Sequence, residues 1–283
     1  MVHLSHIGAM LWSLPWRWIL LGLFVVWGAY WVRQGYLLAH RSGHYSPRLT
    51  FVPQLIRFWL STLIGGWFVG PLKIHGWENV EGLDGARLVI APNHQLACDG
   101  ILAARALRLR SMRFLMAINQ VQGWRGPLAA WMGAISVGYD PKNPASAAAE
   151  SAINAMVTEK DSKLVIFPQG SLIKDDQWDR KQFKHGAVRI AKAGEERSGA
   201  KFYLVPVVCQ YDYDSAHAAW WQRFAKKLGL PRKAFGRTVY GATVMIGKPI
   251  PASSLPDDEE AATDIYYKAM LETRDQCLEK CPH

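Results

Sequence analysis

The first 72 residues of the chain contain no aspartate or glutamate, and they carry two uncharged runs, at residues 18–32 and 58–72. Five arginines and seven of the thirteen tryptophans also lie in this stretch. As a helix, each run would be about 22 Å long, which is shorter than the roughly 30 Å hydrocarbon core of a bilayer. Tryptophan and tyrosine flank the runs, and these residues settle at membrane–water interfaces. Residues 1–72 are therefore expected to form a hydrophobic, Trp- and Arg-rich two-helix membrane anchor.

Several arrangements of this anchor compete. A cleaved signal peptide is disfavoured, because residues 1–16 contain no lysine or arginine and no small-residue cleavage site follows. The connection between the runs is basic, which favours the cytoplasmic side of a membrane. A two-span hairpin with this connection inside would put the rest of the chain outside, whereas a re-entrant or interfacial pair keeps both on the cytoplasmic side. We expect the monotopic or re-entrant pair, at the cytoplasmic face of the inner or plasma membrane. A buried helix pair of a soluble protein is the alternative.

The remaining residues, 73–283, alternate short apolar runs with amphipathic stretches. The expected strands are rich in Val, Ile and Leu, as buried strands are; they cover residues 87–91, 113–118, 134–138, 163–168, 202–208 and 237–247. The expected helices cover residues 98–109, 127–132, 144–160, 182–193 and 259–278. Strands that alternate with helices predict an α/β fold, a layered mixed sheet flanked by helices.

The charge balance and the missing motifs narrow the function. A net charge of +10 suits an anionic partner: nucleic acid, an anionic membrane surface or a phosphorylated substrate. Basic and aromatic residues do not interleave along one face of residues 73–283, so we expect no nucleic acid. No Gly-x-Ser-x-Gly elbow is present, which disfavours a serine hydrolase, and the four scattered cysteines do not form a disulfide framework.

A histidine and an aspartate five residues apart, His94 and Asp99, follow the first expected strand. On one continuous helix they would lie about 140° apart. They can meet only if His94 sits in the loop before the helix and turns back over its first turn, and Pro92 supports a break there. The carboxylate would then fix the imidazole tautomer and leave the other nitrogen to accept a proton. By spacing alone, a histidine at a helix start beside an ordinary aspartate fits equally well.

With its later motifs, the chain resembles the glycerolipid acyltransferase family over about residues 73–250. That family places a His-x4-Asp block after its first core strand, followed by Phe-Pro-Glu-Gly-Thr-Arg, Phe-Lys-x-Gly and Val-Pro-Val segments. The matching residues here are His94 and Asp99, then 167–172, 183–186 and 205–207, and residues 76–80 look like the family's opening segment. The resemblance implies that residues 73–283 are an α/β acyltransferase domain.

Four positions depart from the family's motifs. The glutamate, threonine and arginine of the Phe-Pro-Glu-Gly-Thr-Arg block are here Gln169, Ser171 and Leu172, and an arginine of another block is Tyr139. In the family the two arginines are implicated in reading the phosphate of the acceptor. An arginine fork binds phosphate through two hydrogen bonds, which neither tyrosine nor leucine can reproduce.

The lysine of the Phe-Lys-x-Gly segment is present as Lys184. Other basic residues near it in the sequence are Lys174, Arg180 and Lys181. The loss of the two arginines therefore disfavours a glycerol phosphate monoester as acceptor and favours a lysophospholipid with a headgroup, a glycolipid or another lipid alcohol. A diverged 1-acylglycerol-3-phosphate acyltransferase that uses the lysines is the alternative.

The resemblance implies transfer of a fatty acyl group from an acyl thioester, acyl-CoA or acyl carrier protein, to a lipid hydroxyl. His94 would act as general base, with Asp99 holding its tautomer. The expected substrate-binding residues are Gln169, Gly170, Ser171, Lys184, Tyr139 and Leu172. The backbone at Gly170 and Ser171 is expected to stabilise the oxyanion. No metal or cofactor is expected, and the partners would be the lipid acceptor, the acyl donor and anionic lipids of the membrane surface. A lipid hydrolase and a catalytically silent membrane-binding module are the alternatives from other classes.

Overall fold

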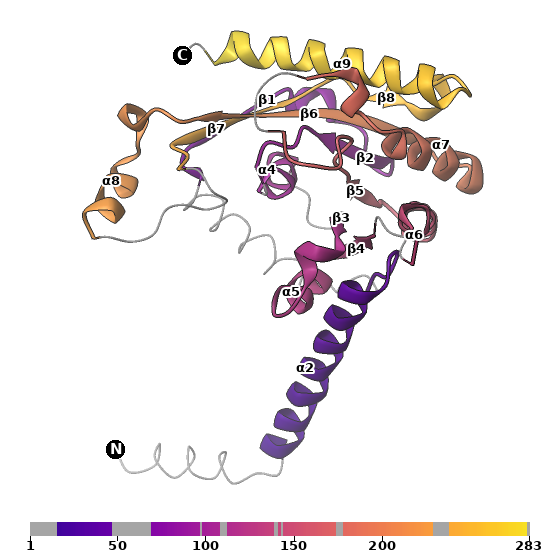
Figure 1. Ribbon diagram of the computed structural model, residues 1–283, viewed down its shortest axis with the longest axis vertical. Helices are drawn as coiled ribbons and strands as arrows, with labels where there is room; N and C mark the ends of the chain where they lie inside the picture. The colour runs from indigo at the N-terminus through magenta and orange to yellow at the C-terminus, as the bar shows by residue number, and fades with distance from the viewer. Residues whose placement is uncertain are drawn as a thin grey trace.

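A computed structural model of the 283-residue chain describes residues 16–46, 69–96, 98–107, 112–138, 141–142, 144–173, 178–228 and 238–281. In these residues an eight-stranded mixed sheet with helices on both faces forms an α/β fold (Figure 1). The layered mixed sheet flanked by helices that the sequence predicts is thereby confirmed.

The order of the strands places the loop after β2 near the middle of the sheet. The strands are β1 (Leu72–His75), β2 (Arg87–Pro92), β3 (Arg113–Ala117), β4 (Ala134–Val137), β5 (Lys163–Val165), β6 (Phe202–Asp212), β7 (Gly241–Ile246) and β8 (Ile250–Pro251). They follow the order β1-β7-β6-β2-β5-β3-β4, and β8 pairs with β6. Strands β2 to β6 run parallel to one another, whereas β7 is antiparallel to β6. The carboxyl ends of β2 to β6 therefore share one edge.

Strand β6 is four residues longer than the sequence predicts. Its first part pairs with β2 up to Val207, and its second part, from Val207 to Asp212, pairs with β7. The antiparallel partner satisfies the backbone of β6 beyond the end of β2, so the strand continues past residue 208. This extension carries Tyr211 to the carboxyl edge of the sheet.

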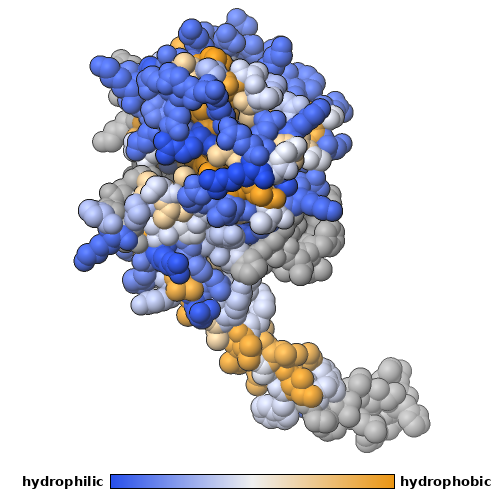
Figure 2. All heavy atoms as spheres, turned by 90° about the vertical axis from the view of Figure 1, so that its right-hand side faces the viewer, coloured by the Kyte–Doolittle hydropathy of each residue, from blue (hydrophilic) through white to orange (hydrophobic). Residues whose placement is uncertain are grey.

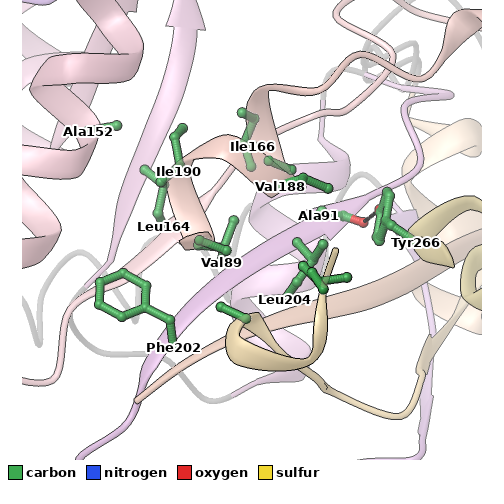
Figure 3. Packing of buried hydrophobic residues seen from close by; sticks show 14 of the residues in the cluster. Val89, Ala91, Ala152, Leu164, Ile166, Val188, Ile190, Phe202, Leu204 and Tyr266 are labelled. Atoms are coloured by element: carbon green, nitrogen blue, oxygen red, sulfur yellow. Dashed lines mark hydrogen bonds between the residues drawn. The ribbon is translucent and has the colours of Figure 1, made fainter. Parts of the chain in front are cut away.

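Helices cover the two faces of the sheet unequally. The helices are α2 (Trp16–His40), α4 (Asp99–Ala106), α5 (Arg125–Trp131), α6 (Ala145–Thr158), α7 (Gly186–Ser198), α8 (Trp220–Lys227) and α9 (Glu259–Lys280). Buried residues of α4 pack with Ile90 and Val207 on one face, and those of α6, α7 and α9 pack with Val89 and Leu204 on the other. Figure 3 shows this second layer, in which the hydroxyl of Tyr266 donates a 2.6 Å hydrogen bond to the carbonyl of Ala91.

The C-terminal part of α2 belongs to the α/β domain. Trp31 and Leu38 are buried in a cluster with residues of α5. The two backbones meet where Gly35 of α2 lies against Gly126 and Pro127: a Cβ on Gly35 would overlap the backbone nitrogen of Pro127. Only glycine permits such a close approach of two helices. The end of the described N-terminal stretch, residues 41–46, then runs beside β4.

The N-terminal half of α2 projects away from the domain (Figure 1). Every large apolar side chain from Trp16 to Trp27 is exposed, and Figure 2 shows a hydrophobic patch on the projecting helix. Within the described parts of the chain, none of the helices combines the length and the hydropathy that crossing a bilayer requires. The first uncharged run lies in α2. The second, residues 58–72, lies outside the described residues up to 68, and its end leads into β1, so the expected second anchor helix stays a prediction.

Candidate active site

The loop that follows β2 carries His94 and is fixed by the buried residue before it. The side chain of Asn93 donates to the carbonyl of Cys209 at 3.1 Å and accepts from the N–H of Cys209 at 2.7 Å. Its amide thus takes the place of a strand residue beside β6 at the point where β2 has ended. Asn93 was not singled out from the sequence, since one asparagine beside a histidine carries no distinctive signal.

His94 and Asp99 meet because the loop turns back over the start of α4. Nδ1 of His94 lies 3.2 Å from Oδ2 of Asp99. The same carboxylate oxygen accepts the backbone N–H groups of Gln95 at 2.7 Å and Leu96 at 2.8 Å. Asp99 therefore closes the loop with its side chain while it orients the imidazole. The Asp99 side chain is fully buried, whereas that of His94 is 17% exposed, so of the two side chains only the histidine is accessible from solvent.

Tyr211 completes the surroundings of Asp99. Its hydroxyl donates a hydrogen bond to Oδ1, the carboxylate oxygen that does not face His94. Burial raises the pKa of Asp99, and the hydrogen bonds from His94 and Tyr211 act in the opposite direction. Burial, followed by the charge of Asp99, raises the pKa of Tyr211 well above its ordinary value, so this phenol stays a donor. The sequence-based strand ended at residue 208 and therefore missed Tyr211. Two-residue alternation with Val205 and Val207 would have indicated its face.

Three residues of the segment after β5 contact His94. The ring of Phe167 stacks on the imidazole with centroids 3.8 Å apart and planes inclined by 14°. Oε1 of Gln169 accepts the N–H of His94 at 2.8 Å, and the N–H of Ile173 donates to the His94 carbonyl at 2.7 Å. Gln169, which stands where the family has glutamate, is thus buried in the site and contacts the backbone of the histidine.

Gly170, Ser171 and Lys184 form the turn beside this segment. Gly170 has φ of +66°, a left-handed conformation that favours glycine, and its N–H donates to the Phe167 carbonyl at 3.1 Å. A Cβ on Gly170 would lie 2.9 Å from Nζ of Lys184, so the lysine lies across the turn. Because the Gly170 N–H is used within the turn, the exposed Ser171 is the remaining backbone donor of the two; its N–H bonds to no other described residue.

Of the two positions where the family has arginine, the structure describes Leu172 but not Tyr139. Leu172 is 52% exposed and directly precedes Ile173, whose N–H is bonded to His94. Tyr139 lies outside the described residues. It follows Gly138, just beyond the end of β4, and β4 runs parallel to β3.

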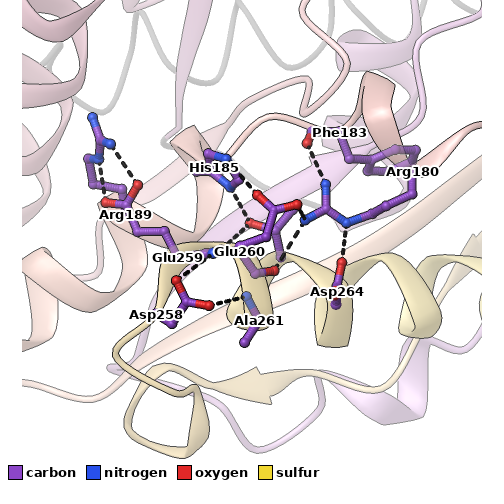
Figure 4. A network of polar contacts seen from close by, with 10 residues as sticks. Arg180, Phe183, His185, Arg189, Asp258, Glu259, Glu260, Ala261 and Asp264 are labelled. Atoms are coloured by element: carbon purple, nitrogen blue, oxygen red, sulfur yellow. Dashed lines mark hydrogen bonds and ion pairs between the residues drawn. The ribbon is translucent and has the colours of Figure 1, made fainter.

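Arg180, a basic residue near Lys184 in the sequence, is engaged elsewhere. Its guanidinium pairs with Glu260 at 2.8 Å and with Asp264, and it also donates to the carbonyl of Phe183 at 3.1 Å (Figure 4). These contacts hold residues 180–183 against the first turns of α9. Arg180 thus serves the packing of α9, whereas Lys184 lies across the turn at Gly170.

Comparisons with known proteins agree with this arrangement. Residues 71–210 match the family described as Acyltransferase. No curated protein sequence matches the chain significantly. The fold is similar to the crystal structure of the 1-acyl-sn-glycerophosphate (LPA) acyltransferase PlsC from Thermotoga maritima, with a TM-score of 0.50 and 15% identity, over 95% of this chain and 97% of that chain. At this identity the likeness shows the fold. Residues 71–210 are therefore a domain of the Acyltransferase family, which confirms the resemblance to the glycerolipid acyltransferases predicted from the motifs.

Proposed function

We propose that the protein is a membrane-associated enzyme that transfers a fatty acyl group from an acyl thioester to the hydroxyl of a lysophospholipid or related lipid alcohol. The observation that carries the proposal is the pairing of His94 with the buried Asp99 in a domain of the Acyltransferase family. The carboxylate occupies Nδ1, so Nε2 is the nitrogen that takes the proton of the acceptor.

The reaction needs no acyl-enzyme. His94 removes the proton from the acceptor hydroxyl as the oxygen attacks the thioester carbonyl, and Asp99 stabilises the imidazolium that forms. The tetrahedral intermediate then collapses with cleavage of the carbon–sulfur bond. The leaving thiolate takes the proton from His94, which restores the neutral imidazole. The N–H of Ser171 is the candidate donor to the oxyanion, because the turn leaves it without a bond to another described residue.

The surroundings of His94 suit this role. Phe167 restricts the tilt of the imidazole from one face, and Gln169 and Ile173 hold the backbone on both sides of it. A base held in this way needs little reorganisation when the acceptor arrives. Only 17% of the His94 side chain is exposed to solvent, so a bound acceptor and acyl chain would be enough to displace the water that contacts the ring.

Helix α2 and the nature of the substrates support membrane association. The exposed apolar residues of its N-terminal half, from Trp16 to Trp27, suit the interface of a bilayer. The packing of Gly35 on α5 holds the helix to the catalytic domain. A lysophospholipid acceptor and its product are both membrane lipids, so this attachment would hold the site near them, at the cytoplasmic face.

The choice of acceptor rests on Leu172 and Tyr139. Neither can bind a phosphate as an arginine does, which favours an acceptor with a headgroup over lysophosphatidate. Lys184 provides one positive charge at the turn, enough to attract the phosphodiester of such a lipid.

The test is acyl transfer by the purified full chain, measured both as thiol release and as acylated lipid. His94→Ala and Asp99→Asn are expected to lower the rate by about 10²–10⁴-fold, the usual contribution of a general base. His217→Ala is the matched control, because His217 pairs with Asp212 at 2.7 Å across the same five-residue spacing on the exposed surface. A His94→Ala enzyme that keeps more than a tenth of the activity would exclude the mechanism. Thiol release without a lipid acceptor, with free fatty acid as product, would indicate the hydrolase instead.

A further inference from the structure

Helix α8 presents an exposed apolar stripe away from the body of the domain. Trp220, Phe224 and Leu228 recur every four residues and are 77%, 57% and 58% exposed. At about 100° per residue the three side chains fall within roughly 80° of the helix surface. An amphipathic helix normally turns such a stripe toward the core, whereas here it faces solvent.

The opposite side of α8 fixes the helix to the domain. Gln222 is fully buried and donates to the carbonyl of Val239 at 3.2 Å, while it accepts the N–H of Ala219 at 2.9 Å. Gly70 lets this side chain approach, because a Cβ there would lie 2.7 Å from Nε2 of Gln222. Gln222 is about 200° from Trp220 around the helix. Because α8 is attached to the domain through Gln222, on the opposite side of the helix, the apolar stripe faces solvent.

Positive charge borders the stripe. Arg223, Lys226 and Lys227 are exposed on α8, and they belong to a stretch, residues 215–256, that has seven basic residues and no acidic residue. Only residues 1–77 form a longer stretch without an acid. Residues 1–72 and 215–256 together hold twelve of the 33 basic residues, so the rest of the chain has 21 basic against 23 acidic residues. The excess of positive charge thus lies in residues 1–72 and 215–256, and the second of these stretches includes α8.

The position of α8 relates it to the active site. Strand β6 carries Tyr211 to the carboxyl edge of the sheet and ends at Asp212, and α8 begins eight residues later. Figure 1 shows α8 beyond this end of the sheet, separate from the helices that cover its faces. Helix α8 therefore follows β6 at the end of the strand that carries Tyr211.

We propose that α8 is a second membrane contact, which lies in the interface of a bilayer that contains anionic phospholipids. Trp220, Phe224 and Leu228 enter the boundary between headgroups and acyl chains, and the flanking cations bind lipid phosphates. A protein partner fits less well: three side chains offer on the order of 400 Å², against about 800 Å² per partner in a standard interface. The proposal extends the membrane association of the proposed function to a site remote from α2 in the sequence.

The experiment places an environment-sensitive fluorophore on α8 of the full chain. Trp220→Cys is labelled with a nitrobenzoxadiazole group in a Cys281→Ser background, since Cys98, Cys209 and Cys277 are buried. On vesicles of phosphatidylcholine and phosphatidylglycerol, the emission is expected to shift to shorter wavelength. The matched control is the same label at Ile265→Cys, an exposed position of α9, where no shift is expected. Protein that binds the vesicles while the label on α8 keeps its emission in water would overturn the proposal.

A second measurement tests the charge. Replacing Arg223, Lys226 and Lys227 together by glutamine is expected to weaken binding to the anionic vesicles at low salt by about fivefold for each residue, and to leave binding to pure phosphatidylcholine unchanged. The control is the triple replacement of Lys201, Lys268 and Lys280, which are exposed outside α8. Equal losses in both triple variants would show an effect of net charge alone and overturn the role of α8. A wild-type chain that binds no vesicles would refute both this proposal and the membrane association above, whereas vesicle binding without acyl transfer would refute only the activity.

Discussion

The hydroxyl of Tyr211 donates a hydrogen bond to one carboxylate oxygen of Asp99, and the other oxygen faces Nδ1 of His94. The tyrosine lies 112 residues beyond the aspartate, at the end of the central strand β6. Tyr211 does not reach the imidazole itself. It is a positioning residue, which supports the charge and the orientation of the carboxylate that holds the base.

Replacing Tyr211 by phenylalanine is expected to change the pH dependence of the reaction. Burial already raises the pKa of Asp99, and the Tyr211 hydrogen bond counteracts this rise. Without the hydroxyl the pKa of Asp99 rises further. Only the ionised carboxylate supports the imidazolium, so activity is lost at a higher pH as the solution is acidified. The acid limb of kcat/KM against pH should therefore move to higher pH. At pH values below this limb, the loss of one charged hydrogen bond should lower kcat/KM by about tenfold or more relative to the wild type.

The control for this change is Tyr213→Phe, two residues further on and exposed. Its pH profile should equal that of the wild type. A Tyr211→Phe enzyme with lower activity at every pH but an unmoved acid limb would show that Tyr211 contributes packing alone.

Replacing Gly35 by alanine is expected to loosen α2 from the catalytic domain. The new methyl group would overlap the backbone of Pro127, and a well-packed backbone contact cannot move aside as a flexible side chain does. Overpacking of this kind costs about 1–3 kcal/mol in the free energy of unfolding. Denaturant titration of the full chain in detergent measures the change.

Gly22→Ala provides the comparison on the same helix, because a Cβ at Gly22 would meet nothing within 4 Å. Alanine is a better helix former than glycine, so this variant should be stabilised by about 0.5–1 kcal/mol. If Gly35→Ala behaved in the same way, the close packing of α2 on α5 would be wrong.

Local patterns in the sequence predicted much of this architecture. The periodicity of apolar residues located the core strands and helices, since each buried element must present an apolar face. The loop geometry of His94 and Asp99 followed from their 140° separation on a helix together with Pro92, because only a reversal before the helix lets them meet.

The missed features depend on contacts between residues far apart in the chain. Tyr211 reaches Asp99 because pairing with β7 extends β6, and no local signal reports that partner. Gly35 reads as an ordinary helix glycine until Gly126 is packed against it. Arg180 reads as a candidate phosphate ligand until α9 supplies its carboxylates. In each case the role of the residue depends on contacts with residues that are distant in the chain, which the local sequence does not reveal.

Lys184→Met is expected to weaken the binding of an anionic acceptor. The lysine lies across the turn at Gly170 and brings a positive charge to it. Loss of one charged hydrogen bond, about 1.5–3 kcal/mol, would raise the KM for a phospholipid acceptor by about tenfold or more. The value of kcat should change far less, because Lys184 has no part in proton transfer. Lys181→Met, three residues earlier and exposed, serves as control. An equal rise in KM for an uncharged lipid alcohol would count against a role in binding charge.

The positions of Leu172 and Tyr139 lead to the prediction about the acceptor. Leu172 is half-exposed and precedes Ile173, whose N–H bonds to the His94 carbonyl; Tyr139 lies outside the described residues and follows β4 by two positions in the sequence. If both positions face the headgroup, restoring arginine at each should improve the use of a phosphate monoester. Leu172→Arg with Tyr139→Arg is expected to raise activity on lysophosphatidate relative to headgroup-bearing acceptors by about tenfold or more, since each recovered charged hydrogen bond contributes about 1.5–3 kcal/mol.

The comparison is a competition assay, in which the wild type and the double variant receive lysophosphatidate and lysophosphatidylethanolamine together. The wild type should acylate the phosphodiester first, because its site lacks the arginine forks that a dianionic monoester requires. The single variant Leu172→Arg should show part of the change, since one of the two restored contacts to the phosphate is then present. A wild type that prefers lysophosphatidate, with a preference that the double replacement does not alter, would assign the phosphate to Lys184 and remove Leu172 and Tyr139 from the acceptor site.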